Sequence, residues 1–170
     1  TDLNQLVDEL VDFFSPQAAA ASVNVRTQLD AEPAEIVIDP GLIKQAVLNL
    51  MINAVQAMTS ARGTERANGG CDELMIRTQR GESGRRRALQ VRVIDTGPGI
   101  EADRLDEIFQ PYFSTRKGGT GLGLPTSRRI AEEHGGTLEA HSALGRGTEF
   151  VLTLPLQPPA STTTESAAAS

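Results

Sequence analysis

Apolar residues at the start of the chain recur with the period of an α-helix. Six of them share one face of that helix: Leu3, Leu6, Val7, Leu10, Val11 and Phe14. Thr1 or Asp2 could cap its first turn, and a Ser-Pro pair at 15–16 is expected to disturb it, although proline can also open a following turn. Residues 22–29 then alternate like a strand, and the short apolar run 35–39 is interpreted as a second strand.

The rest of the chain predicts two further helices and four further strands. A long helix opens after the Asp-Pro-Gly sequence at 39–41, covers about 41–58 and ends near Ser60. The last helix follows a glycine-rich stretch and stops at Gly135. The four strands are expected at 73–80, 87–95, 137–142 and 148–156. The first two read as a hairpin, and the last two are joined by a glycine-bearing turn.

Three segments lack this periodicity. Residues 61–70 form a polar loop, and 96–120 carry only a short helical stretch near 104–109. A long irregular segment inside a compact domain is typically a functional lid. The end of the chain is rich in Pro, Ser, Thr and Ala, so 157–170 is expected to be a disordered tail after a domain of residues 1–156.

Strands in adjacent pairs, separated by helices, favour an α+β fold. We expect a two-layer α/β sandwich with a mixed sheet of about five strands, three main helices and a lid.

Composition limits the function classes. The chain has 170 residues, enough for one domain with a core, and only 4% aromatic residues, so that core should be aliphatic. A net charge of −6 argues against a nucleic-acid partner and against direct membrane contact. A single cysteine, Cys71, excludes an internal disulfide and a cysteine metal cage. Without an apolar span or a signal peptide, we expect a cytoplasmic domain cut from a longer protein, whose own membrane anchoring stays open.

The glycine-rich stretch at 114–125 raises the question of phosphate binding. No Gly-Lys pair is present, which excludes a P-loop, and the glycines do not follow a strand, which excludes a dinucleotide-binding fingerprint. They stand directly before a helix, where backbone N–H groups form an anion site. Arg116 and Lys117 would add positive charge beside it. The alternative is a flexible hinge that merely starts a helix.

Two other stretches carry candidate chemistry. Asp95 ends a strand and is followed by Gly97 and Gly99, so its carboxylate could accept a hydrogen bond from an exocyclic amine such as that of adenine. Asn49 and Asn53 are four residues apart and share one helix face, and amide oxygens suit Mg²⁺. The alternatives are a plain turn after the strand and an amide pair hydrogen-bonded inside the fold.

The order of these motifs resembles the Bergerat-fold ATP-binding family, closest to the catalytic domain of nitrogen-regulation-like sensor histidine kinases. The sequence "DPGLIKQAVLNLMINAVQAM" is similar to the N box and "DTGPGI" to the G1 box. The F box corresponds to "IFQPYFSTR", the G2 box to "GGTGLGL" and the last glycine motif to "GRGTEF". The resemblance covers roughly residues 1–156.

The resemblance implies Mg²⁺ and ATP as cofactors and assigns the site residues. Asp95 would bind the adenine amino group, Thr148 would reach adenine through water, and Asn53 would hold Mg²⁺ with Asn49 assisting. Phosphates would lie at the start of the last helix. The implied binding set is Asn49, Asn53, Asp95, Gly97, Gly99, Ile100, Thr115, Arg116, Lys117, Gly119, Thr120, Gly121, Leu122, Gly123 and Thr148. The residues given catalytic roles are Asn49, Arg116 and Lys117, and those expected to anchor the lid on the core are Phe109, Tyr112 and Phe113.

Two departures shape the functional interpretation. Arg116 stands where these sensors usually have lysine, so either Arg116 or Lys117 could meet the γ-phosphate. Asn49 stands where the hydrolytic members of the family carry a glutamate that activates water, and asparagine is a poor general base. The resemblance therefore implies phosphoryl transfer to an acceptor rather than free hydrolysis.

The acceptor histidine is expected on a separate dimerisation domain absent from this chain, with a response regulator downstream. His134 reads as a helix-end residue that caps and packs, and His141 as a strand residue. The isolated domain should be a monomer that binds nucleotide without phosphorylating itself. Two alternatives remain open: a nucleotide-binding interaction module without kinase activity, and a Bergerat-fold ATPase.

Overall fold

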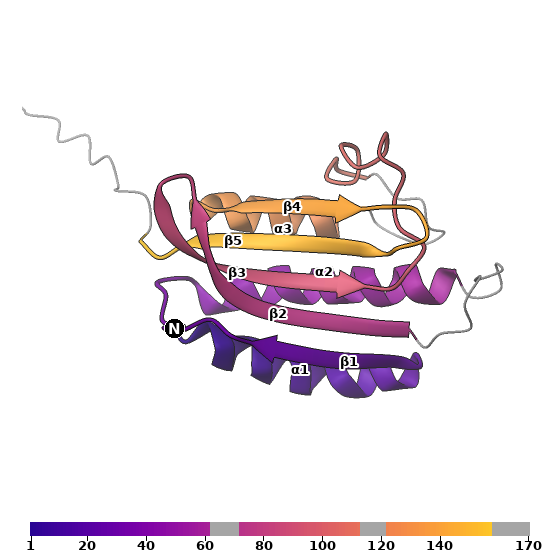
Figure 1. Ribbon diagram of the computed structural model, residues 1–170, viewed down its shortest axis with the longest axis horizontal. Helices are drawn as coiled ribbons and strands as arrows, with labels where there is room; N and C mark the ends of the chain where they lie inside the picture. Colours follow the sequence, from indigo (N-terminus) through magenta and orange to yellow (C-terminus); the bar gives the residue numbers. More distant parts are fainter. Residues whose placement is uncertain (62–71, 113–121, 158–170) are drawn as a thin grey trace, which may run out of the picture.

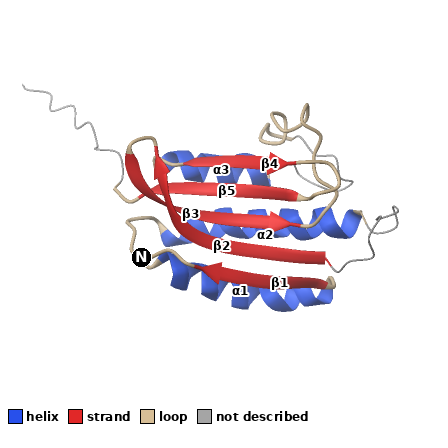
Figure 2. Ribbon diagram, in the orientation of Figure 1, coloured by secondary structure: helices blue, strands red, loops and turns tan. Residues whose placement is uncertain are grey.

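The computed structural model describes residues 1–61, 72–112 and 122–157, which form two layers (Figure 1). The helices are α1 (Leu3–Ala20), α2 (Pro40–Ser60) and α3 (Gly123–Glu133). The strands are β1 (Val23–Leu29), β2 (Asp72–Ser83), β3 (Arg86–Asp95), β4 (Thr137–Ser142) and β5 (Thr148–Pro155). Figure 2 shows the helices together on one side of the sheet. The predicted α+β sandwich is confirmed.

The strands lie in the order β1-β2-β3-β5-β4. β1 pairs with β2 in parallel, and the other three pairs are antiparallel, so the sheet is mixed as expected. A parallel pair needs a crossover connection, and α2 supplies it between β1 and β2. The tight turn after β2 needs a left-handed backbone, which Gly84 provides with φ of 61°. This hairpin carries β3 to the middle of the sheet, where it ends beside α2.

An aspartate caps the first turn of α1 and another caps the first turn of α2. Asp2 accepts a hydrogen bond from the Gln5 backbone N–H at 3.1 Å, and Asp39 accepts one from Leu42 at 3.0 Å. Such caps satisfy N–H groups that have no partner within the helix. α1 is longer than the sequence predicts, because it continues through Pro16 to Ala20. The fixed φ of proline is compatible with a helix, and the costs are one lost backbone hydrogen bond and crowding of the ring against the preceding turn.

The apolar run 35–39 is not a strand, and that prediction was wrong. Glu35 forms one isolated bridge with Asp2, and the Ile36 N–H donates to the Thr1 carbonyl at 2.9 Å. Ile36 is buried, whereas Val37 is 73% exposed. The alternation of apolar residues reflects packing of this connector beside the start of α1 rather than pairing within the sheet.

The core lies between the helices and the facing side of the sheet. Its largest fully buried side chains are Phe14, Phe150, Leu3, Ile43, Leu50, Met51, Met58, Leu74, Ile76, Leu89, Ile130 and Leu152. Ten of these twelve are aliphatic or Met, as the low aromatic content predicts. Each buried side chain of this size contributes about 1.5–3 kcal/mol relative to exposure.

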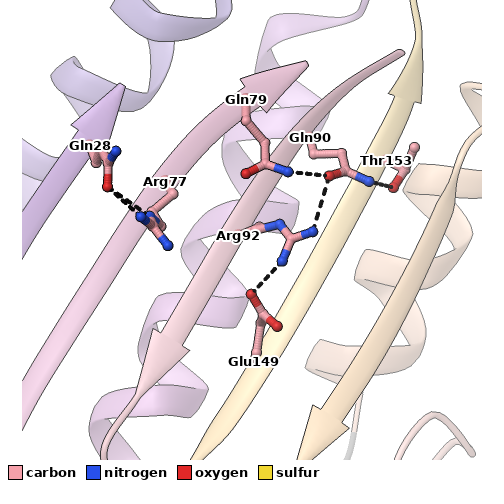
Figure 3. A network of polar contacts seen from close by, with 7 residues as sticks. All are labelled: Gln28, Arg77, Gln79, Gln90, Arg92, Glu149 and Thr153. Atoms are coloured by element: carbon pink, nitrogen blue, oxygen red, sulfur yellow. Dashed lines mark hydrogen bonds and ion pairs between the residues drawn. The ribbon is translucent and has the colours of Figure 1, made fainter. Parts of the chain in front are cut away.

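The other face of the sheet carries polar side chains that bond to one another (Figure 3). Arg77 donates two hydrogen bonds to Gln28 across β1 and β2, at 2.9 and 2.6 Å. A second group spans β2, β3 and β5: Gln79 bonds to Gln90, Gln90 to Thr153, and Arg92 to Gln90 and Glu149. Cross-strand pairs of this kind stabilise a sheet face that no described helix covers.

Candidate functional site

Asp95 is the last residue of β3, and its carboxylate is buried at the end of the sheet. It is 3% exposed, and its Oδ1 accepts a hydrogen bond from the Gly97 N–H at 2.8 Å. A side chain at position 97 would meet that same Oδ1 at 2.8 Å and Met58 of α2 at 3.5 Å. The loop after Asp95 therefore lies close against α2, and only glycine leaves its backbone this near the carboxylate.

Thr148 lies next to Asp95 in the β3–β5 ladder. It is 6% exposed and begins β5. Its hydroxyl is 2.9 Å from the hydroxyl of Ser142, the paired residue at the end of β4. A carboxylate and two hydroxyls thus stand in a row across the end of three strands.

The loop after Asp95 is fastened to the β4–β5 turn. The Ile100 N–H donates to the Ser142 hydroxyl at 2.8 Å, and the Gly145 N–H donates to the Pro98 carbonyl at 2.8 Å. Gly99 has φ of 77°, and a Cβ there would collide with the backbone of Ala143. These contacts bring the two predicted glycine motifs together, although they are about fifty residues apart in sequence.

The two amides of α2 lie on the side of the helix that faces α3. Asn49 and Asn53 are each half-buried. The Asn49 side-chain amide donates a hydrogen bond of 3.4 Å to the carbonyl of Gly123, which is the first residue of α3. Since Asn53 follows one turn later on the same face, both amides stand between the start of α3 and the end of β3.

The start of α3 differs from that of the other two helices. The residue at its cap position is Leu122, which has no side-chain acceptor, whereas α1 and α2 are capped by aspartate. The first helical bond of α3 joins the Thr126 N–H to the Leu122 carbonyl at 3.0 Å. A helix that begins without a side-chain cap presents N–H groups suited to an anion.

Ser127 was not identified from the sequence, but it fixes how α3 lies on α2. It is fully buried, and its hydroxyl lies 2.9 Å from the Gly123 carbonyl and 3.2 Å from the Ala46 carbonyl of α2. The available signal was a lone small polar residue on the apolar face shared with Ile130 and Ala131. Ser127 thereby sets the distance between the amides of α2 and the start of α3.

Part of the predicted site lies outside the described residues. This applies to Thr115, Arg116, Lys117, Gly119, Thr120 and Gly121, and to Phe113. The predicted binding residues that are described, from Asn49 to Thr148, gather at one end of the fold around α2, α3 and the ends of β3 and β5.

The beginning of the lid, residues 101–112, packs against the core through Phe109. This ring meets Phe150 edge to face at 6.4 Å, and the Arg128 guanidinium lies 5.0 Å from its centroid. Two expectations need correction here. The stretch near 104–109 is a series of turns with hydrogen bonds three residues apart, not a regular helix. Tyr112 is 79% exposed with φ of 64°, so it does not anchor the lid on the core.

A hollow of about 370 Å³ lies beside this segment. Its lining residues are Ala102, Leu105, Asp106, Phe109, Arg128, Glu139, Ala140 and His141. None of them belongs to the predicted binding set, so this hollow next to β4 is not the candidate site. The predicted site includes residues 115–121, which are not described.

Across 1–61, 72–112 and 122–157, no group of three His, Cys, Asp or Glu side chains could hold a metal. None of the described helices combines the length and apolar character needed to cross a bilayer.

Both histidines take structural positions. His134 follows α3, and its two ring nitrogens contact the backbone of Ile130 and Asp39, which confirms its predicted capping role. His141 lies on β4, as predicted, and its side chain is exposed.

Comparisons with known proteins agree with the geometry. Residues 38–158 match the family described as "Histidine kinase-, DNA gyrase B-, and HSP90-like ATPase". The chain is 37% identical over 155 residues to the sensor histidine kinase ZraS of Escherichia coli K12, covering 91% of this chain and 30% of ZraS. It is 42% identical over 120 residues to the sensory histidine kinase/phosphatase NtrB of Rhodobacter capsulatus, covering 71% and 33%.

A solved structure shares the fold over nearly the whole chain. The nucleotide-free catalytic domain of histidine kinase ThkA aligns with a TM-score of 0.75 at 27% identity, covering 92% of this chain and 93% of that one. The chain spans about a third of the length of the curated relatives ZraS and NtrB. These findings confirm the family resemblance read from the five motifs.

Proposed function

Because the chain belongs to the histidine kinase-, DNA gyrase B- and HSP90-like ATPase family, we propose that it binds Mg-ATP and transfers the γ-phosphate to a histidine. The observation that carries this proposal is a convergence at one end of the fold. The buried Asp95–Thr148 pair, the two amides of α2 and the uncapped start of α3 meet there. The Asp95–Thr148 pair is suited to a base, the two amides to a metal, and the start of α3 to phosphates.

Asp95 is the proposed anchor for the adenine base. A carboxylate offers about four lone-pair positions, so it can accept an amino hydrogen besides the Gly97 N–H. Burial of the carboxylate strengthens such a bond, because a polar contact is worth more at low dielectric. Gly97, Gly99 and Ile100 would form the wall beside the flat ring.

The phosphates and Mg²⁺ are proposed to lie between α2 and the start of α3. Asn53, assisted by Asn49, would offer an amide oxygen to the metal, which when bound neutralises phosphate charge. Leu122 and Gly123 open α3, whose N–H groups would contact phosphate oxygens. The remaining binding residues, proposed from the motifs alone, are Thr115, Arg116, Lys117, Gly119, Thr120 and Gly121.

Transfer to another domain is favoured over hydrolysis. Phosphoryl transfer depends mainly on positioning and charge neutralisation, and Asn49 is a poor base for activating water. Both ring nitrogens of His134 are engaged with backbone groups, which makes it a poor acceptor. We propose that the acceptor lies on a dimerisation domain of the whole protein, with a response regulator as the next partner. ATP supply places such a domain in the cytoplasm.

The test is calorimetric titration of Mg-ATP into the chain and into an Asp95→Ala variant. The native chain should bind, and the variant should lose about tenfold or more in affinity because an acceptor of the base is missing. A dimerisation domain carrying the acceptor histidine is then added with radiolabelled ATP, and label should appear on that histidine. A folded native chain that does not bind ATP would overturn the proposal. Binding without transfer would leave only a nucleotide-binding module.

A further inference from the structure

The hydroxyl of Ser142 occupies a junction beside the proposed base site. Ser142 ends β4 and lies next to Thr148 in the β4–β5 ladder, and Thr148 lies next to Asp95 in the β3–β5 ladder. The Ser142 Oγ is within 2.9 Å of three polar groups: the Ile100 N–H, the Gly147 carbonyl and the Thr148 hydroxyl. Ser142 therefore links Thr148, at the end of the sheet, to the loop after Asp95.

The hydrogens of these groups can be assigned by counting. A serine hydroxyl has one hydrogen and two lone pairs. The Gly147 carbonyl, at 2.8 Å, can only accept, so it takes the Ser142 hydrogen. The Ile100 N–H, at 2.8 Å, can only donate, so it takes one lone pair of Ser142. Thr148 must therefore donate its own hydrogen to the second lone pair of Ser142, at 2.9 Å.

We propose that Ser142 is a positioning residue that sets nucleotide selectivity by fixing the hydrogen of the Thr148 hydroxyl. The inference rests on the proposed ATP site. With that hydrogen directed at Ser142, Thr148 presents only lone pairs to the site. Asp95, when ionised, is also an acceptor. The base end of the site is then an all-acceptor surface, which matches the amino group of adenine, directly or through one water, and disfavours a carbonyl at the same position.

Removing the Ser142 hydroxyl should change selectivity more than it changes the fold. In Ser142→Ala the Thr148 hydroxyl loses its acceptor and can rotate, so it can donate to a carbonyl of the base. The loop after Asp95 keeps a second tie, because the Gly145 N–H still donates to the Pro98 carbonyl at 2.8 Å. The Ile100 N–H loses a partner in this variant, and that loss weakens all nucleotides alike.

The experiment compares Mg-ATP with Mg-inosine triphosphate, which carries a carbonyl in place of the adenine amino group. Both are titrated calorimetrically into the native chain, S142A, S142C and S142T. The preference for ATP is expressed as the dissociation constant of Mg-inosine triphosphate divided by that of Mg-ATP. This ratio should fall about five- to tenfold in S142A, the size expected for one redirected hydrogen bond. It should fall less in S142C, whose thiol is a weak partner, and stay near native in S142T, which keeps a hydroxyl.

A matched background separates this role from a structural one. Thr148→Val removes the hydroxyl that Ser142 is proposed to orient, so S142A added to T148V should leave the ratio unchanged. An equal loss of affinity for both nucleotides in S142A, with the ratio kept, would overturn the inference and make Ser142 a structural residue. A native chain that binds neither nucleotide, or an Asp95→Ala variant that binds ATP normally, would instead overturn the proposed site, and this inference with it.

Discussion

His134 joins the end of α3 to the start of α2. Its Nε2 accepts a hydrogen bond from the Asp39 backbone N–H at 3.0 Å, and its Nδ1 lies 2.7 Å from the Ile130 carbonyl. The second contact requires the ring hydrogen on Nδ1, which leaves Nε2 as the acceptor. The two helices that carry the proposed phosphate and metal groups are thus fastened at their ends remote from the site, while Ser127 fastens them near it.

Replacing His134 should therefore destabilise the domain. We expect His134→Ala to lower the free energy of unfolding by about 1–2 kcal/mol, because two backbone groups lose their partner. Chemical denaturation followed by circular dichroism measures the change. His141→Ala is the matched control, since His141 is exposed on β4, and its effect should stay within about 0.5 kcal/mol. Equal effects of the two variants would contradict a connecting role for His134.

Removing the metal should separate the role of Asn53 from that of Asp95. ATP affinity should fall when EDTA replaces Mg²⁺, because phosphate charge is no longer neutralised. Asn53→Ala should lose most of this metal-dependent gain, whereas Asp95→Ala should weaken binding with and without Mg²⁺ alike. Calorimetric titrations in both buffers measure these differences. An Asn53→Ala variant with a native response to EDTA would remove Asn53 as the proposed metal ligand.

Sequence reasoning predicted the helices and the sheet well because their apolar periodicity is strong. Its error at 35–39 has a clear cause: a short apolar run is compatible with a strand, but burial of Ile36 beside the start of α1 is a tertiary contact that periodicity does not contain. The helix through Pro16 is a similar case, because Ala18, two residues beyond the proline, is buried against the core, and periodicity does not contain that tertiary contact.

The candidate site was predicted by residue type, and the structure adds the residues that hold it. Asp95 and Thr148 stand out in sequence because they adjoin glycine motifs. Ser127 and Ser142 do not, because each acts through a hydroxyl whose partners are backbone groups of distant segments. Ser142 lies beside Thr148 because of the β4–β5 register, and no local sequence pattern predicts that register.

Arg128 should hold the beginning of the lid through Phe109. Its guanidinium lies over the ring, 5.0 Å from the centroid, and such a contact contributes about 0.5–1 kcal/mol at an exposed site. We expect Arg128→Ala to increase amide hydrogen exchange in residues 101–112 while exchange in β3 stays native. Arg129→Ala is the matched control, because Arg129 is an exposed neighbour on α3 paired only with Glu133 among the described contacts. Unchanged exchange in residues 101–112 would show that Phe150 alone secures Phe109.

The ion pair between α1 and α2 gives a small pH dependence. A hydrogen bond from Lys44, with a second from Gln5, lowers the pKa of the Glu9 carboxyl below its ordinary value. A lowered pKa means that the contribution to stability is present above the unfolded-state pKa and is lost as pH falls through the folded-state pKa. Lys44→Met should raise the pKa of Glu9 toward its ordinary value, and an NMR titration of its side chain measures this. An unmoved pKa would show that Lys44 is not the cause.

The pair of Arg92 and Glu149 should stabilise the uncovered face of the sheet. The Arg92 guanidinium donates to Glu149 at 2.9 Å, both side chains are about three-quarters buried, and the Arg92 Nε has no hydrogen-bond partner in the described part of the chain. Removing the carboxylate takes away the counter-ion of a largely buried guanidinium and leaves it one hydrogen bond, to Gln90, at 3.4 Å. Glu149→Ala should lower the free energy of unfolding by about 1–3 kcal/mol, and Glu149→Gln by less, because an acceptor remains.

A double-mutant cycle distinguishes this pair from general loss of packing. If the charge on Arg92 causes the penalty, Arg92→Met should restore part of the stability lost in Glu149→Ala, so the two changes together cost less than their sum. Denaturant unfolding of the four proteins measures the coupling, with Glu139→Ala on exposed β4 as the control for removing a carboxylate from the same face. Strictly additive effects would mean that the two side chains stabilise the sheet independently, and that the polar network of this face is a set of separate contacts.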